Sequence, residues 1–183
     1  MQSVCSLLPS EYAERVVEAR ARLSGLPAIG AIYDPPFAHF THQLAEEYDW
    51  EGLRQAPGAQ AKREKPISVR TSGVLLFSGE ELSLAVAVFR SQQLADFQAR
   101  VWDVVSAHAQ GTIVGFYQPE VWLPHVTVKR CGKDPKVFGE AMSLLAQNNA
   151  FDWSMTVDNI AVQHDPGKNS RTHYLRLHFP LAG

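Results

Sequence analysis

Two copies of the tripeptide His-x-Thr are the residues in this chain whose types and spacing could do chemistry. The first copy occupies residues 39–41 and the second occupies residues 125–127. In an extended strand, side chains i and i+2 leave the same face roughly 7 Å apart, so each copy would present an imidazole beside a hydroxyl. Two such pairs facing one another across a cleft would supply two proton-transfer groups and two hydroxyls that hold a phosphate.

The reaction that needs such a set is the opening or the formation of a phosphodiester without a metal. One group must take a proton from the attacking oxygen, and another must give a proton to the leaving oxygen. Histidine suits both tasks because its unperturbed pKa, about 6.5, lies near neutral pH. Each copy would therefore combine a proton-transfer group, His39 or His125, with an anchor for the same phosphate, Thr41 or Thr127.

Strand alternation extends the predicted cleft face beyond the second motif. The side chains of His125, Thr127 and Lys129 should share one face, while Val126 and Val128 pack behind the strand. We therefore predict that Lys129 lies beside Thr127 and binds the phosphate with its ammonium group.

The same alternation predicts which side chains of the first motif strand face the cleft. His39, Thr41 and Gln43 should share the cleft face, and His42 should point away from it and have a structural role. A zinc site made by His39 and His42 is excluded, because side chains three apart on a strand diverge. The chain has no Cys-x-x-Cys or His-Glu-x-x-His pattern either, so we expect no metal and no cofactor.

Length, composition and charge are those of an ordinary globular protein. The chain has 183 residues, of which 45% are hydrophobic and 20% are charged, which fits one domain or two small lobes with a shared core. A formal net charge of −2 argues against an extended nucleic-acid groove, where affinity comes from many phosphate contacts. A local pocket for one phosphate, or for one RNA end, is compatible with that charge.

Other signals in the sequence favour the cytoplasm. Two cysteines, Cys5 and Cys131, do not make a disulfide framework. The N-terminal residues lack the basic leader and long apolar run of a signal peptide, and no segment approaches the roughly 20 apolar residues of a membrane span. We therefore expect a cytoplasmic protein that does not associate with membranes.

The order of predicted elements repeats along the chain. The periodicity and turn signals predict, in the first half, a strand at 3–8, a helix at 10–25, a motif strand, a helix from Asp49 that is interrupted at 57–58, and a strand at 67–77. A hairpin leads to a strand at 82–89. After this strand we expect a helix capped by Ser91, a glycine-containing loop, a motif strand, a helix at 134–147, a strand at 153–162, a turn at 165–169 and a strand at 172–179.

The spacing supports a duplication. The strand after each motif begins 28 positions beyond its histidine, at Ile67 and at Trp153. We therefore expect an α+β fold with two pseudo-twofold-related lobes, each a mainly antiparallel sheet with helices on its outer side, which together form a central cleft. Residues 1–183 would form a single bilobal domain whose interleaved lobes comprise approximately residues 1–80 and 81–183.

These features resemble the 2H phosphoesterase superfamily, the group that contains bacterial 2′-5′ RNA ligases and RNA 2′,3′-cyclic phosphodiesterases. The likeness covers nearly the whole chain. The family pattern is His-apolar-Thr/Ser-apolar, and residues 125–128 meet it fully. The first copy departs at its final position, where His42 replaces the apolar residue.

The resemblance implies a metal-free cleft with His39 and His125 as the acid/base pair and with Thr41 and Thr127 as phosphate anchors. It implies a phosphodiesterase for 2′,3′-cyclic phosphates or 2′-5′ linkages of nucleotides or RNA ends, by hydrolysis or ligation. Which histidine is the acid stays open. The alternative is a non-catalytic module that binds a nucleotide or an RNA terminal phosphate. The presence of both histidines and both threonines argues against this binding module, because holding a phosphate does not require two proton carriers.

Overall fold

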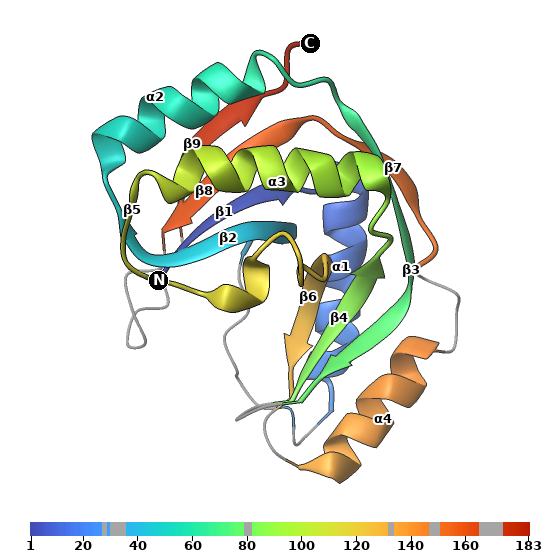
Figure 1. Ribbon diagram of the computed structural model, residues 1–183. Helices are drawn as coiled ribbons and strands as arrows, with labels where there is room; N and C mark the ends of the chain where they lie inside the picture. The colour runs from blue at the N-terminus through green and yellow to red at the C-terminus, as the bar shows by residue number, and fades with distance from the viewer. Residues whose placement is uncertain (27–28, 30–35, 79–81, 132–133, 147–150, 165–173) are drawn as a thin grey trace.

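The computed structural model describes the chain except residues 27–28, 30–35, 79–81, 132–133, 147–150 and 165–173. The described residues form a curled antiparallel sheet of nine strands with four α-helices packed outside it (Figure 1). The predicted α+β fold with a central cleft is confirmed.

The helices and strands follow the repeated order that the sequence predicts. The first half contains β1 (Gln2–Leu7), α1 (Ser10–Ser24), β2 (His39–Tyr48), α2 (Trp50–Ala61) and β3 (Ile67–Phe77). The second half contains β4 (Ser83–Val88), α3 (Gln92–Ser106), β5 (Ala109–Ile113), the short 3-10 helix η1 (Gly115–Tyr117), β6 (His125–Arg130), α4 (Pro135–Ala146), β7 (Ser154–Val157), β8 (Asn159–His164) and β9 (Tyr174–Pro180).

Three predicted elements differ from the structure. The interruption of α2 at residues 57–58 was wrong, since Leu53, Pro57 and Ala61 are buried together along one continuous helix. The glycine-containing loop before the second motif includes β5 and η1. The predicted strand at 153–162 is two strands, β7 and β8, that lie in different parts of the sheet. The predicted turn at 165–169 lies outside the described residues.

The strand order places the two motif strands next to each other. It runs β7-β3-β4-β6-β2-β1-β8-β9, and β5 pairs with β2 beside this path. Strand β3 of the first half pairs with β4, and β8 of the second half pairs with β1. This exchange ties the two repeats into one sheet. Strands β2 and β6 share the register pair Phe40 and Val126, and they diverge from that crossing.

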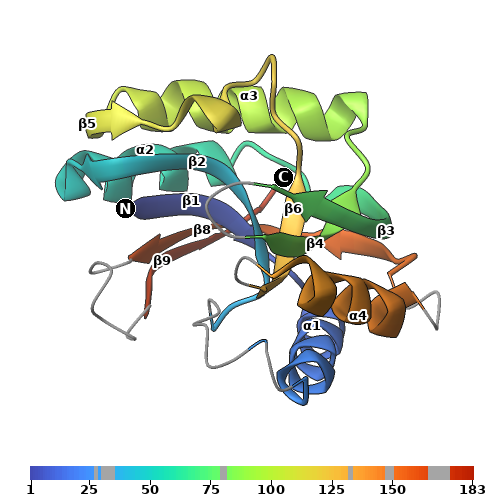
Figure 2. The ribbon, with the colours of Figure 1, turned by 90° about the horizontal axis from the view of Figure 1, so that it is seen from below.

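The helices pack in two pairs on the outer faces of the sheet. Helices α2 and α3 lie together on one side, and α1 and α4 lie on the other (Figures 1 and 2). Their buried faces follow the helical period, with Val16, Ala19 and Leu23 in α1 and Leu94, Phe97, Val101 and Val105 in α3. Ser91 caps α3 as predicted, because its side chain accepts from the Leu94 amide. Among the described residues, no helix is long and apolar enough to cross a membrane.

Gly111, the glycine of β5, should tolerate a side chain poorly. Its φ is +73°, and an added Cβ would meet the Glu46 carboxylate that accepts from the Thr112 amide. We expect Gly111→Ala to lower the free energy of unfolding by about 1–3 kcal/mol, measured by urea denaturation. Gly115→Ala is the control, since a Cβ there has no atom within 4 Å. Equal free energies of unfolding for the two variants would show that neither the positive φ of Gly111 nor its closeness to Glu46 restricts this position.

Candidate active site

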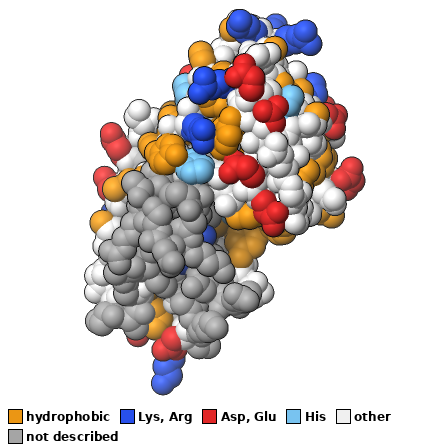
Figure 3. Space-filling view, turned by 90° about the vertical axis from the view of Figure 1, so that its left-hand side faces the viewer, with side chains coloured by type: hydrophobic (Ala, Val, Ile, Leu, Met, Phe, Trp, Pro, Cys, Tyr) orange, Lys and Arg blue, Asp and Glu red, His pale blue; other side chains and the backbone are white. Residues whose placement is uncertain are grey.

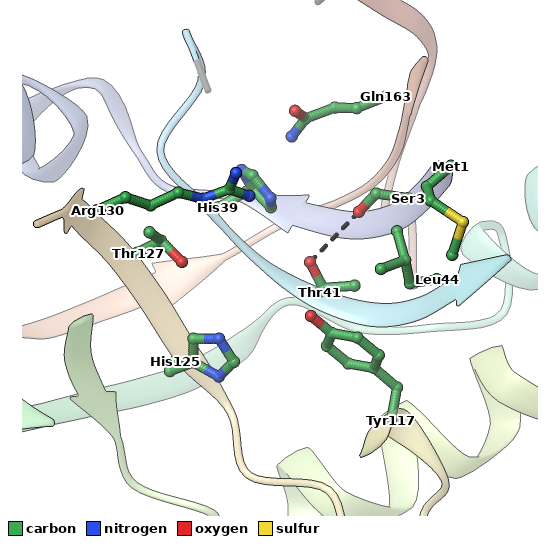
Figure 4. Close-up of a pocket in the computed structure, with 10 residues that line it drawn as sticks. All are labelled: Met1, Ser3, His39, Thr41, Leu44, Tyr117, His125, Thr127, Arg130 and Gln163. Atoms are coloured by element: carbon green, nitrogen blue, oxygen red, sulfur yellow. Dashed lines mark hydrogen bonds between the residues drawn. The ribbon is translucent and has the colours of Figure 1, made fainter. Parts of the chain in front are cut away.

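A cavity of about 220 Å³ opens where the two motif strands meet (Figure 4). The structure brings His39, Thr41, His125 and Thr127 together in its lining, although the two motifs are far apart in the sequence. Figure 4 shows the imidazoles on opposite sides of the cavity, each projecting from its own strand. The remaining lining residues come from the N-terminal strand, both motif strands, η1 and β8: Met1, Ser3, Leu44, Tyr117, Arg130 and Gln163.

Both histidines are oriented by the same kind of backbone hydrogen bond. Nδ1 of His39 lies 2.7 Å from the carbonyl oxygen of Phe37, and Nδ1 of His125 lies 2.8 Å from that of Leu123. Because a carbonyl oxygen only accepts, Nδ1 carries the proton in each neutral ring. Nε2 is then the atom of each ring that takes up or gives a proton.

The surroundings of His125 favour its neutral form. Its ring centroid lies 4.4 Å from that of Phe77 and 6.0 Å from that of Phe116. Burial lowers the pKa of His125 below its ordinary value, and the hydrogen bond to the Leu123 carbonyl opposes part of that change. A neutral imidazole accepts a proton, so His125 is suited to act as a general base.

Lys129 does not line the cavity, contrary to the prediction. Two consecutive residues of β4 pair with Thr127 and Lys129, so Val128 is an extra residue in β6. Such a β-bulge reverses the alternation of side chains beyond it. The side chain of Lys129 is buried, with Lys129 only 3% exposed, and Arg130 takes the cavity face in its place.

The first motif strand has the same irregularity at the same distance from its histidine. Two consecutive residues of β1 pair with Thr41 and Gln43, so His42 is the extra residue. Gln43 is fully buried, and Leu44 lines the cavity instead. The predicted face of Gln43 was therefore wrong for the same reason as that of Lys129.

Side chains from the helices bind backbone carbonyls at both bulges. Gln98 of α3 donates from Nε2 to the carbonyl of His42 at 3.0 Å. Arg20 of α1 donates to the carbonyls of Thr127 and Val128, each at 3.0 Å. A bulge disturbs the ladder of hydrogen bonds between strands, so these donors stabilise the course of each motif strand behind the cavity.

Tyr117 enters the cavity from η1, and strand patterns gave no signal for it. Burial raises the pKa of Tyr117, and the nearby Thr41 and Arg130 oppose part of that change. Thr41 also lies 3.3 Å from the Ser3 hydroxyl. The backbone carbonyl of Tyr117 accepts from Gln98 Nε2 at 2.9 Å, so one glutamine connects this loop to β2.

The prediction that His42 points away from the cavity is confirmed. The side chain is fully buried, and its Nε2 lies 2.8 Å from the hydroxyl of Ser6. That hydroxyl donates to the Asn159 carbonyl, so His42 is the donor to Ser6. Burial, with a smaller contribution from His39, lowers the pKa of His42 to about 3. His42 is thus a neutral packing residue.

Among the described residues, the remaining His, Cys, Asp and Glu side chains form no metal-binding group, since no three of them are grouped so as to hold a metal ion. Both cysteines are buried. Burial raises the pKa of Cys5 to about 12, so this thiol is unsuited to act as a nucleophile.

Sequence comparison gives the family. The family model described as the 2′-5′ RNA ligase superfamily matches residues 8–169. The chain belongs to this superfamily, that of the 2H phosphoesterases. Membership supports an enzyme of phosphodiesterase or ligase type. A search of curated proteins finds no match.

Solved structures show the same fold. The protein TT0787 of Thermus thermophilus is 19% identical, with a TM-score of 0.67 over 100% of this chain and 98% of that chain. LigT of E. coli in apo form is 14% identical, with a TM-score of 0.66 over 100% of this chain and 97% of that chain. The same LigT complexed with 3′-AMP is 15% identical, with a TM-score of 0.66 and coverage of 100% and 98%.

Gln98 should contribute more to stability than a glutamine on the exposed side of the same helix. Gln98→Leu leaves two carbonyls without their donor, so we expect it to lower the free energy of unfolding by about 1–3 kcal/mol. Gln92→Leu is the matched control, because Gln92 is exposed and donates to the exposed Asp96, and its effect should stay within about 0.5 kcal/mol. Urea denaturation measures both, and equal losses would contradict the role of Gln98.

The pKa of His125 should lie below 6.5 and should depend on Phe116. Burial disfavours the imidazolium, so Phe116→Ala should expose the ring and raise the pKa toward its ordinary value. Titration of the His125 Cε1 proton by NMR measures this change. Phe89→Ala, at a position that is 65% exposed, is the control and should leave the titration unchanged. An unchanged midpoint in Phe116→Ala would disprove the aromatic contribution.

Proposed function

We propose that this protein is a metal-independent phosphodiesterase that acts on 2′,3′-cyclic phosphates or 2′-5′ linkages of nucleotides or RNA ends. The observation that carries the proposal is the pair of histidines with identical backbone hydrogen bonds in one cavity. Each Nδ1 is held by a carbonyl, so two Nε2 atoms serve as proton carriers. The hydroxyls of Thr41 and Thr127 line the same space.

His125 acts as the base when a cyclic phosphate is hydrolysed. Its lowered pKa keeps the ring neutral, and Nε2 takes a proton from the water that attacks phosphorus. The bond between phosphorus and O3′ breaks, and His39 gives a proton from Nε2 to O3′. The products are a 2′-phosphate and a 3′-hydroxyl. In-line attack requires base and acid on opposite sides of phosphorus, and Figure 4 shows the two rings on opposite sides of the cavity that would hold it.

Ligation uses the same groups with another nucleophile. When the attacking oxygen is the 5′-hydroxyl of a second RNA end, loss of O3′ leaves a 2′-5′ phosphodiester. The base and the acid keep their roles, because the bond that breaks is the same. The 2H fold thus serves hydrolysis and joining with one arrangement of histidines.

The threonines hold the phosphate while charge builds on its oxygens. Hydroxyl groups donate to the non-bridging oxygens, and donors fixed in place before the reaction stabilise the developing charge. Thr41 is restrained by its hydrogen bond with Ser3. Arg130 supplies positive charge in the same cavity.

Replacing either catalytic histidine should remove most of the activity. We expect His39→Ala and His125→Ala each to lower kcat on nucleoside 2′,3′-cyclic phosphates by about 10² or more, as is usual for loss of a general acid or base. His108→Ala, outside the cavity lining, should keep its activity. The profile of kcat against pH should be bell-shaped, and a chelator should have no effect.

Two outcomes would contradict the proposal. Full activity in the double variant of His39 and His125 would exclude these residues as the proton carriers. Binding of nucleoside monophosphates, seen by calorimetry, with no product from cyclic phosphates over hours would favour a binding module.

A further inference from the structure

Gln163 is a buried polar side chain of the cavity that the proposed mechanism does not use. It belongs to β8, is only 3% exposed and lines the cavity. A buried amide needs partners for its donor and for its acceptor, because it has lost the water that would otherwise bind them. The partners of the two ends of this amide therefore show what kind of group the cavity can hold beside it.

One end of the Gln163 amide has a partner in the protein, and the other end does not. Nε2 donates to Sγ of Cys5, on the neighbouring strand β1, at 3.3 Å. Oε1 has no hydrogen-bond partner among the described residues, and it is not sealed off from solvent as Oε1 of Gln98 is. It is therefore an accessible acceptor on a side chain that lines the cavity (Figure 4).

This acceptor differs chemically from the groups that the mechanism assigns to the phosphate. The hydroxyls of Thr41 and Thr127 and the guanidinium of Arg130 can all donate hydrogen bonds, which is what phosphate oxygens require. An amide oxygen only accepts. Oε1 of Gln163 is thus unsuited to a phosphate oxygen and suited to a hydrogen-bond donor on another part of the substrate.

The acceptor is also uncharged, which matters beside a phosphate. Acidic side chains are present on the molecular surface, as Figure 3 shows for one face, but no carboxylate is among the described residues that line the cavity. A carboxylate would bind a donor and would also repel the phosphate. The amide oxygen accepts from a donor without that repulsion.

The strand register places the Gln163 amide close to the phosphate anchors but not on them. The amide reaches Cys5, and Cys5 pairs with Thr41 of β2. Because neighbouring strands lie about 4.8 Å apart, Oε1 lies roughly 5–10 Å from the backbone of Thr41. A nucleoside whose cyclic phosphate is held by Thr41 extends over such a distance.

We propose that Gln163 is a specificity-determining residue, whose Oε1 accepts a hydrogen bond from an uncharged donor on the nucleoside of the substrate. This inference rests on the proposed function, in which Thr41 and Thr127 hold the reacting phosphate. Two groups of a nucleoside supply such a donor, an amino group on the base and the 5′-hydroxyl of the ribose. A substrate without the donor leaves Oε1 with neither a partner nor water, so it reacts less well.

Three cyclic phosphates distinguish the two donors: adenosine 2′,3′-cyclic phosphate, purine riboside 2′,3′-cyclic phosphate, which lacks the amino group, and 5′-deoxyadenosine 2′,3′-cyclic phosphate, which lacks the hydroxyl. We expect kcat/KM for at least one of the two analogues to be about tenfold lower than for the adenosine compound. The analogue that reacts slowly identifies the donor. Equal kcat/KM values for all three in the unmodified protein would overturn the inference.

Gln163→Leu should remove this discrimination. Leucine cannot accept the hydrogen bond, so the ratio of kcat/KM between the adenosine compound and the slow analogue should approach one. Gln2→Leu is the matched control, because Gln2 is also buried, in the adjacent strand, and lies outside the described lining. It should keep the full ratio. An unchanged ratio in Gln163→Leu would overturn the inference, since Gln163 would then act on the phosphate or on the fold alone.

Binding measurements test Gln163 separately from turnover. Calorimetry with adenosine 2′-monophosphate and the two corresponding analogues should show about tenfold weaker binding of the analogue that lacks the donor. Gln163→Met, which keeps the length of the side chain, should bind all three equally. That result without turnover of any cyclic phosphate would contradict the proposed function and leave the role of Gln163 supported. Equal affinities in the unmodified protein would overturn the role of Gln163.

Discussion

Each motif strand changes the direction of its side chains directly after the threonine, and the cavity depends on this β-bulge. The carbonyls around the two bulges accept hydrogen bonds from Gln98 of α3 and Arg20 of α1. The same irregularity buries Lys129 and brings Leu44 and Arg130 into the cavity. The α-helices therefore help to determine which side chains line the cavity, although they contribute no residue to its described lining.

The two histidines share an orientation and differ in their surroundings. A carbonyl holds Nδ1 of each ring, which leaves Nε2 as the reactive atom in both. Phe77 and Phe116 pack on His125, whereas Arg130 ends β6 on the side of the crossing toward His39, because β2 and β6 are antiparallel with Phe40 opposite Val126. In the proposed mechanism, the duplicated fold supplies two equivalent proton carriers, and the residues around them give each a different role. General acid and base catalysis needs this difference, because one ring must begin neutral and the other protonated.

Sequence patterns were sufficient where a structural rule acts over a few residues. The helix cap at Ser91, the back-facing His42 and the strand limits of 67–77 follow from local periodicity. They were insufficient for α2, where burial of Pro57 among neighbouring side chains outweighs its helix-breaking tendency. They also failed for Tyr117, because its loop is held by hydrogen bonds with α3 and β2, which lie far away in the sequence.

The sequence by itself determined the two His-x-Thr pairs, the duplicated order of elements and the α+β class. Those features depend on residue type and on spacings that any extended strand or helix must obey. Only the tertiary structure decided that Arg130, and not Lys129, lines the cavity. The direction of the side chains beyond the bulge in β6 depends on its pairing with β4 and on the hydrogen bonds that Arg20 of α1 donates. Neither interaction is encoded in the alternation of a single strand.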